Sequence, residues 1–278
     1  MKIRIGVGLG TGHALQEPTQ LGEVVDLLED LAFDSLWMSE RVVGRGLDPI
    51  AALAYAAART TNLKLGTNVL ILAGKDPRLA AKQLATVDEL SGGRLLPAVG
   101  LGKPHPSDQP PYAVERGTRG QVFEAAFASM REHWERLGTR PLEVWFGSRS
   151  AAALERTGRL ADGWLGSFQT PAETAAARLT IVAAAAAAGR TIDDDHYGTV
   201  ISYTRGSRTD EAVGVVQSLS EHTDVEQLLP AGGAELATVI AAHVNGGLTK
   251  FVLIPANQPS DWAEEFTWLR EVTAPLET

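Results

Sequence analysis

The sequence contains no cysteine among its 278 residues, and no stretch approaches the roughly 20 apolar residues of a membrane span. The absence of cysteine excludes disulfides, thiol nucleophiles and cysteine-ligated zinc or iron–sulfur centres. Basic runs are also missing, and the chain as a whole is acidic: 25 Lys and Arg against 34 Asp and Glu give a formal net charge of −9. Neutralising phosphates requires clustered basic residues, so we expect no nucleic-acid partner. The first residues lack the apolar stretch of a signal peptide, and we expect a cytoplasmic protein without a membrane partner.

Motifs for several common chemistries are absent too. The chain has no His-Glu-x-x-His, no Gly-x-Ser-x-Gly and no Gly-x-x-x-x-Gly-Lys-Ser/Thr. Its six histidines are scattered without metal-ligand spacing, so no metal site is expected. Glycines alternate from Gly6 to Gly10, but this spacing is not the dinucleotide fingerprint, and the segment is predicted to be a strand.

What the chain does have is a regular alternation of short apolar runs and amphipathic stretches. We predict strands over Lys2–Leu9, Ser35–Ser39, Leu63–Leu72, Leu95–Leu101, Leu142–Phe146, Gly163–Gly166, His196–Tyr203 and Lys250–Pro255. Helices are predicted over Thr19–Ala32, Pro49–Thr60, Asp76–Leu90, Gly117–Leu137, Ser150–Leu160, Pro171–Ala188, Asp210–Leu219, Glu235–Val244 and Asp261–Glu271. Eight strands, each followed by a helix, indicate the α/β class and a single (β/α)8 TIM barrel over residues 1–278. A doubly wound sheet is the alternative.

A barrel of this kind carries its chemistry at the carboxyl ends of the strands. This rule selects the segments Gly10–His13, Ser39–Arg41, Asn68–Ala73, Gly100–His105, Gly147–Arg149, Ser167–Gln169, Thr204–Arg205 and Pro255–Asn257. Trp37, Trp145 and Trp164 lie inside predicted strands, where they are expected in the barrel core or in a pocket wall.

Four ordered motifs between residues 65 and 102 point to a known family. They are Gly66-Thr67, Lys75-Asp76-Pro77, Leu90-Ser91-Gly92-Gly93-Arg94 and Gly100-Leu101-Gly102. Two more follow, Arg116-Gly117-Thr118-Arg119 before a helix ending near Trp134, and Ala161-Asp162-Gly163-Trp164 at a strand entry. With these motifs the sequence resembles the luciferase-like family of flavin- and deazaflavin-dependent oxidoreductases. The resemblance implies a TIM barrel that binds a flavin-type ring.

The resemblance also implies where the ring would rest. In the family the ring lies on a non-prolyl cis peptide at the end of the third strand, which here corresponds to Asn68-Val69. A plain strand end capped by Asn68 is the alternative. The strand-end glycines Gly100 and Gly102 are assigned to the same cofactor site.

An anion site is expected where the fifth strand leads into a helix. Backbone N–H groups at a helix start attract phosphate, and Gly147, Ser148 and Arg149 resemble the family's glycine-rich phosphate loop with one glycine replaced. Ser167 and Gln169 at the next strand end would complete the site. A solvated first-turn position for Arg149 is the alternative.

The end of the second strand supplies the acid–base candidates. Many deazaflavin-dependent relatives carry Asp-His at this corner, whereas this chain has Ser39-Glu40-Arg41. Glu40 would accept a hydrogen bond from a ring hydroxyl or act as an acid or base, and Ser39 and Arg41 would contact the cofactor. An arginine cannot shuttle protons, and a surface role for Glu40 and Arg41 is the alternative.

One loop histidine is the second catalytic candidate. Lys103 replaces the glutamate of sugar-phosphate dehydrogenase relatives, so His105 is the better acid or base of this loop. An exposed loop position is the alternative for His105 and for His13, and lone loop histidines more often have that role.

Together these features predict a deazaflavin (coenzyme F-420)-dependent oxidoreductase that transfers a hydride between the cofactor and a small organic substrate. One alternative is an FMN-dependent monooxygenase, which would need a separate flavin reductase. A second alternative is a non-catalytic flavin-binding protein on the same barrel. A homodimer is expected from family habit.

Overall fold

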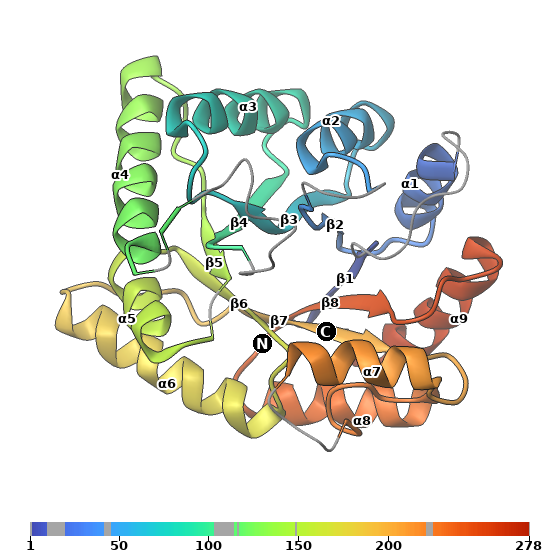
Figure 1. Cartoon of the computed structure of the whole chain (residues 1–278). Helices are drawn as coiled ribbons and strands as arrows, with labels where there is room; N and C mark the ends of the chain where they lie inside the picture. Colours follow the sequence, from blue (N-terminus) through green and yellow to red (C-terminus); the bar gives the residue numbers. More distant parts are fainter. Residues whose placement is uncertain are drawn as a thin grey trace.

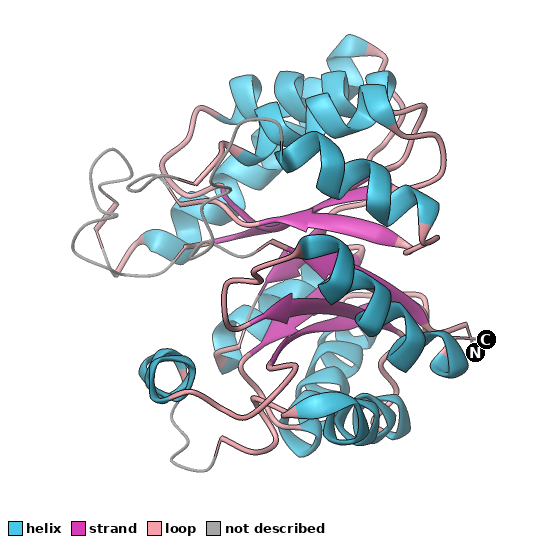
Figure 2. Ribbon diagram, turned by 90° about the vertical axis from the view of Figure 1, so that its right-hand side faces the viewer, coloured by secondary structure: helices cyan, strands magenta, loops and turns pink. Residues whose placement is uncertain are grey.

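The predicted eight-stranded parallel barrel is present in a computed structural model of the chain. The structure describes residues 2–9, 20–41, 46–102, 114–115, 117–147, 149–220 and 225–277. Eight strands form a closed barrel in sequence order, and all the neighbouring pairs are parallel. Helices surround the strands (Figures 1 and 2). The doubly wound sheet is thereby excluded. Among the described residues, no helix combines the length and apolarity needed to cross a membrane.

The strands follow the predicted runs closely. They are β1 (Arg4–Gly8), β2 (Ser35–Met38), β3 (Lys64–Ile71), β4 (Leu95–Gly100), β5 (Trp145–Gly147), β6 (Gly163–Ser167), β7 (Tyr197–Tyr203) and β8 (Lys250–Pro255). The helices are α1 (Gln20–Asp30), α2 (Pro49–Arg59), α3 (Pro77–Leu90), α4 (Arg119–Leu137), α5 (Ala151–Leu160), α6 (Pro171–Ala187), α7 (Asp210–Leu219), α8 (Gly232–Asn245) and α9 (Trp262–Thr273), with a final 3₁₀ turn η2 (Ala274–Leu276).

Two tryptophans fill the middle of the barrel because glycines on neighbouring strands leave room for them. A Cβ on Gly66 would lie 2.4 Å from Cε3 of Trp37, and a Cβ on Gly163 would lie 2.5 Å from Cε2 of Trp145. Both indoles are buried, together with Ala98, Leu165 and Val252. The barrel interior is therefore a packed core, as in barrels generally.

A second and larger apolar layer joins the outer face of the strands to the helices. It includes Ile5 and Val7 of β1 and Phe251 and Leu253 of β8, which alternate with the inward-facing positions of the same strands. Trp164 belongs to this layer rather than to the barrel interior. The strands are thus covered on both faces, as expected for a parallel sheet.

The two largest boundary errors, of three residues each, have physical reasons. Strand β5 begins at Trp145 rather than Leu142, because the N–H of Val144 donates to the Asp162 carboxylate instead of to a neighbouring strand. Helix α8 begins at Gly232 rather than Glu235. The sequence pattern predicts a loop at its first glycines. In the structure Gly233 packs closely on α9, where a Cβ on Gly233 would lie 2.7 Å from Cγ2 of Val272.

Candidate active site

Side chains inside the barrel are buried in the middle of the strands and become partly exposed at the carboxyl ends. Val69, Val200 and Ile254 are partly buried and pack on the tryptophan-containing interior below them. Glycines occupy the last positions of β1, β4 and β5. Apolar side chains and missing side chains therefore meet at one end of the barrel, which is the end where barrel enzymes carry their chemistry.

Val69 stands at the centre of this arrangement. A Cβ on Gly100 would lie 2.8 Å from Cγ2 of Val69, and a Cβ on Gly147 would lie 2.4 Å from its Cγ1. The two glycines thus form a notch into which the valine side chain fits. The β3–β4 register shifts between Asn68 and Leu70, so Val69 is bulged out of the ladder. The predicted cis peptide between Asn68 and Val69 is present.

The end of β2 contacts this bulge through side chains. Ser39 Oγ donates to Asn68 Oδ1 at 2.8 Å and to the Asn68 carbonyl at 3.2 Å. Glu40 Oε2 accepts from the Ile71 N–H at 2.6 Å, and Glu40 Oε1 accepts from Lys75 Nζ at 2.6 Å. The Glu40 side chain is only 5% exposed. Its carboxylate is thus held by protein donors at the edge of the candidate site.

The β5–α5 connection, predicted to bind phosphate, has an uncapped helix start. The side chain of Ser150, the N-cap of α5, makes no capping hydrogen bond. Arg149 is exposed, and its Nη1 donates to the Leu219 carbonyl at the end of α7. This contact links the start of α5 to the end of α7 and involves no ligand, so the phosphate role of Arg149 stays a prediction.

The end of β6 contributes an unpaired polar atom. Gln169 is 7% exposed, and its buried Oε1 has no hydrogen-bond partner among the described residues. Phe168 before it has a positive φ of 54°, which turns the chain sharply after the half-buried Ser167. Buried polar atoms in proteins are nearly always satisfied by protein, water or ligand. Gln169 therefore offers an acceptor to a bound molecule.

Gln169 also lines a small hollow beside the barrel, together with Phe168, Val200, Ile201, Ser202, Gln227, Leu228 and His243. His243 is buried, and its Nδ1 lies 2.8 Å from Thr174 Oγ1. Burial lowers the pKa of His243 to about 4. The hollow is thus lined by a neutral imidazole and an unpaired amide oxygen, with no fixed charge among these side chains.

The structure brings together most of the predicted site residues. Ser39, Glu40, Asn68, Val69, Gly100 and Gly147 form one contact group around the bulge of β3. Gly102 joins it with φ +70°, since a Cβ there would lie 2.9 Å from Ile71 Cδ1. Arg41 is exposed at its edge. His105, Ser148, His13 and Lys103 lie outside the described residues.

One residue that contacts this group, Lys75, had no predicted role. Lys75 appears in the sequence as part of the Lys75-Asp76-Pro77 motif. In the structure Asp76 is the N-cap of α3 and Pro77 is its first residue, both ordinary helix-start positions. The pairing of Lys75 with Glu40 joins residues 35 positions apart. No local pattern gives such a pair, and the signal was only the lysine in the motif.

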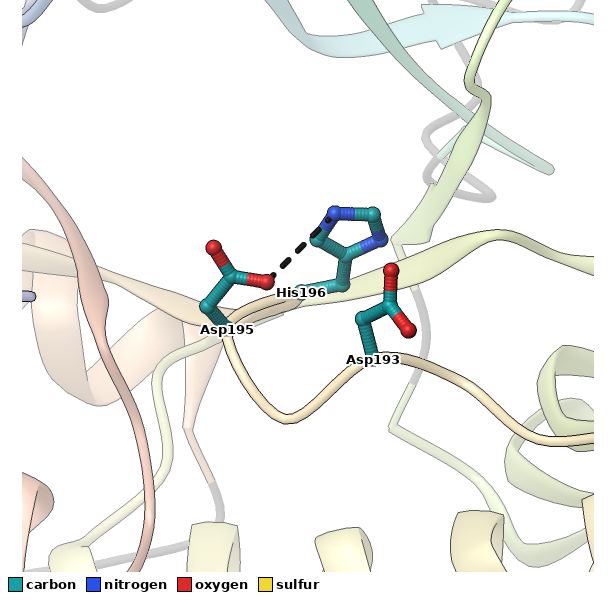
Figure 3. A group of neighbouring side chains, drawn as sticks. All are labelled: Asp193, Asp195 and His196. Atoms are coloured by element: carbon teal, nitrogen blue, oxygen red, sulfur yellow. Dashed lines mark ion pairs between the residues drawn. The ribbon is translucent and has the colours of Figure 1, made fainter. Parts of the chain in front are cut away.

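The opposite end of the barrel carries charged groups of a different kind. Lys250 Nζ, buried inside the barrel, pairs with Asp34 at 2.5 Å. Asp193, Asp195 and His196 lie close together just before β7 (Figure 3). Figure 3 shows the two carboxylates on different sides of the imidazole ring. Asp195 already pairs with Arg4 at 2.7 Å, and His196 Nδ1 lies 2.8 Å from the Asp162 carbonyl. These contacts account for the cluster as a structural one.

Comparison with known proteins agrees with the fold and places the chain among relatives. The sequence model of the luciferase-like monooxygenase family matches residues 1–265. A Mycobacterium tuberculosis protein named as a coenzyme F-420-dependent oxidoreductase is 32% identical over 131 residues, which are 47% of this chain and 34% of that protein. The aligned regions cover 34%, 57% and 65% of three curated relatives, so the chain spans only part of their length.

Two solved structures share the whole architecture. A secondary alcohol dehydrogenase that depends on coenzyme F-420 superposes with a TM-score of 0.84 over 100% of both chains, at 17% identity. A monooxygenase from Streptomyces bottropensis superposes with a TM-score of 0.80 over 99% of both chains, at 18% identity. At these identities the likeness establishes the fold alone.

Proposed function

Because the chain belongs to the luciferase-like monooxygenase family, we propose that it is an oxidoreductase that binds a flavin-type cofactor at the carboxyl ends of its strands. The observation that carries this proposal is the apolar shelf at Val69, set in the notch between Gly100 and Gly147. A planar ring needs an apolar surface with few polar atoms, and cofactor sites of this kind are largely preformed.

The described residues fit such a group in two further ways. Gly8 at the end of β1 leaves room for Ile254, another partly buried apolar side chain packed on the same interior as Val69. Within the part of the chain that the structure describes, the buried Oε1 of Gln169 lacks a partner, and an N–H or O–H of a bound molecule would satisfy it. Val69 would support the ring, and Gln169 would contact a polar part of the molecule.

Between the two cofactors we favour coenzyme F-420. The curated relative at 32% identity carries that cofactor in its name, and the Lys-Asp-Pro and Leu-Ser-Gly-Gly-Arg motifs resemble the same branch. A deazaflavin supplies two-electron hydride chemistry and reacts poorly with oxygen. The substrate class that follows is a small organic molecule with a reducible carbonyl or an oxidisable alcohol, or an enone.

The remaining groups would anchor and orient the cofactor. The uncapped first turn of α5, with Gly147 and Ser148 before it, would receive a phosphate, because its N–H groups and the helix dipole attract anions. Ser167 lies at the neighbouring strand end. Ser39 and Glu40 fix the bulge of β3 on which the ring would rest. We keep the expectation of a homodimer as part of the proposal.

The main alternative is an FMN-dependent monooxygenase supplied by a separate flavin reductase. The family to which the chain belongs is described as luciferase-like monooxygenases, which supports this alternative. A non-catalytic flavin-binding protein is the second alternative, since the family's Asp-His corner is Glu40-Arg41 here and its later glutamate is Lys103.

Equilibrium binding tests the proposal directly. The purified apo-protein is titrated separately with coenzyme F-420 and with FMN, and binding is followed by fluorescence quenching. We expect tight binding of coenzyme F-420 and weak binding of FMN, followed by turnover with carbonyl or alcohol substrates. Tight binding of FMN alone would favour the monooxygenase, and binding without any turnover would favour the non-catalytic protein. Binding of neither cofactor would overturn the proposal.

A further inference from the structure

The bulged end of β3 is tied to β2 by side chains where the backbone ladder stops. The last paired residues of the two strands are Met38 and Thr67. Beyond them the Glu40 N–H reaches the Val69 carbonyl at 3.4 Å, and the Ile71 N–H donates to Glu40 Oε2 at 2.6 Å. The Glu40 carboxylate thus takes the place that a backbone carbonyl of β2 would hold in a longer ladder. Glu40 thus contacts the bulged segment twice, at Val69 through its backbone N–H and at Ile71 through its carboxylate.

The cation of Lys75 compensates the charge of this carboxylate. The two side chains are 5% and 19% exposed, and Lys75 Nζ lies 2.6 Å from Glu40 Oε1. Desolvated charges persist in proteins when they are paired and hydrogen-bonded. Lys75 itself lies in the turn that leads into α3, where its N–H donates to the Leu72 carbonyl. The pair therefore connects the end of β2, the end of β3 and the start of α3.

The segment held in this way carries the Val69 side chain. Ser39 fixes Asn68 on one side of Val69, and Glu40 fixes Ile71 on the other. The valine methyl groups lie so close to Gly100 and Gly147 that a Cβ on either glycine would be 2.8 or 2.4 Å from one of them. A shift of this segment by even one ångström would misplace the shelf, and displacements of that size are costly to bound reactants.

We infer that Glu40 and Lys75 act as a pair of positioning residues that hold the cofactor shelf, and that Glu40 is not a proton-transferring group. This inference rests on the proposed function and deepens it, because it assigns the role of Glu40 within the same site. Both carboxylate oxygens accept hydrogen bonds from the protein, one of them from a backbone N–H that needs a partner. A proton on either oxygen would weaken the hydrogen bond that this oxygen accepts, and it would remove the charge that Lys75 compensates.

Single and double substitutions test the pair. Glu40→Gln and Lys75→Met are compared with the double variant, with Lys75→Arg as the conservative change. Glu132→Gln, in an exposed pair with Arg136 on α4, is the matched control. We expect each single variant to raise the Kd of the preferred cofactor by about tenfold, and the double variant to be no worse than either single one, because paired residues are non-additive. Lys75→Arg and the control should bind as the unmodified protein does.

Amide hydrogen exchange supplies a readout that needs no cofactor. The Ile71 amide should exchange faster in Glu40→Gln and in Lys75→Met, whereas the Leu65 amide on the same strand should keep its rate. This result would stand even if the protein bound neither cofactor, so failure of the proposed function and failure of the pair are distinguishable. Unchanged Ile71 exchange would overturn the inference.

Turnover separates positioning from proton transfer. A lost acid or base lowers kcat by a factor of about 10²–10⁴ and removes one limb of the pH profile while cofactor affinity stays the same. A lost positioning pair weakens cofactor binding and leaves the shape of the pH profile unchanged. A fall in kcat limited to Glu40→Gln, with normal cofactor affinity and Lys75→Met unaffected, would assign proton transfer to Glu40 and contradict the inference.

Discussion

At the scale of single residues, glycines decide where the larger side chains of the barrel can lie. Gly147→Ala would place a Cβ 2.4 Å from Val69 Cγ1 at the end of β5, so the valine has to move. We expect about a tenfold weaker affinity for the cofactor and a loss of about 1–3 kcal/mol in the free energy of unfolding. Fluorescence titration and urea unfolding measure the two effects.

The same site provides its own rescue. Val69→Ala in the Gly147→Ala background removes the clashing methyl groups, so stability should recover at least in part. Gly214→Ala on α7 is the control, because an added Cβ there would meet no described atom within 4 Å apart from its chain neighbours and its own helix backbone. It should be neutral or slightly stabilising. A Gly147→Ala protein with unchanged affinity and stability would contradict the claim that Val69 needs the space left by Gly147.

A buried histidine makes stability depend on pH. The pKa of His243 is lowered to about 4, because the charged imidazole would lose its hydration in the interior. The unfolded chain therefore binds more protons than the folded chain between pH 4 and 6.5. His243 contributes its full stabilisation above about pH 6.5, and up to about 3 kcal/mol is lost as the pH falls through this window.

Substitution of this histidine isolates its share. His243→Asn keeps an N–H near Thr174 Oγ1 and removes the titration. We expect the free energy of unfolding to differ less between pH 7 and pH 5 in His243→Asn than in the unmodified protein, because the variant does not take up this proton on unfolding. Urea unfolding at both pH values measures it, and an equal pH dependence in the two proteins would show that His243 is not the group responsible.

At the scale of elements, the motifs that identify the family mostly stabilise the frame. Arg94, the last residue of the Leu-Ser-Gly-Gly-Arg turn, donates to the carbonyls of Ala57, Thr60 and Leu63. It thereby links the C-terminal end of α2 to the start of β3. Asp162 of the Ala-Asp-Gly-Trp motif accepts from Val144 N–H and from Arg131. Both residues lie at the amino ends of the strands, away from the candidate site.

This division explains what the sequence could predict. Strand and helix periodicity gave all eight strands and nine helices of the described residues, because each element repeats one local pattern. The position of Asn68-Val69 came from the family resemblance. The Glu40–Lys75 pair and the Gln169 Oε1, which has no partner among the described residues, could not be predicted. Both depend on which strand ends meet after the barrel closes.

At the scale of the whole molecule, the two ends of the barrel have different tasks. Figure 1 shows the strands as a ring surrounded by helices, with connections at both ends. At the amino end, Lys250 and Asp34 form a buried ion pair next to Trp37, with the lysine 5.8 Å from the indole. At the carboxyl end, glycines and Val69 form the shelf. Barrel enzymes in general place stability at the first end and chemistry at the second.

Lys250→Met tests this separation. The change leaves the mostly buried Asp34 carboxylate with Lys64, 3.3 Å away, as its remaining cation in the cluster. We expect a loss of about 3–5 kcal/mol in the free energy of unfolding, because breaking a buried pair leaves a poorly compensated charge. Adding Asp34→Asn should restore part of it. The affinity for the cofactor, titrated under conditions where the variant stays folded, should remain within about twofold, since the change lies at the far end of the strands from Val69 and additivity holds over such distances. A Lys250→Met protein that kept its stability but lost cofactor affinity would show that the two ends are coupled through the barrel interior, by way of Trp37 and the glycines that seat it.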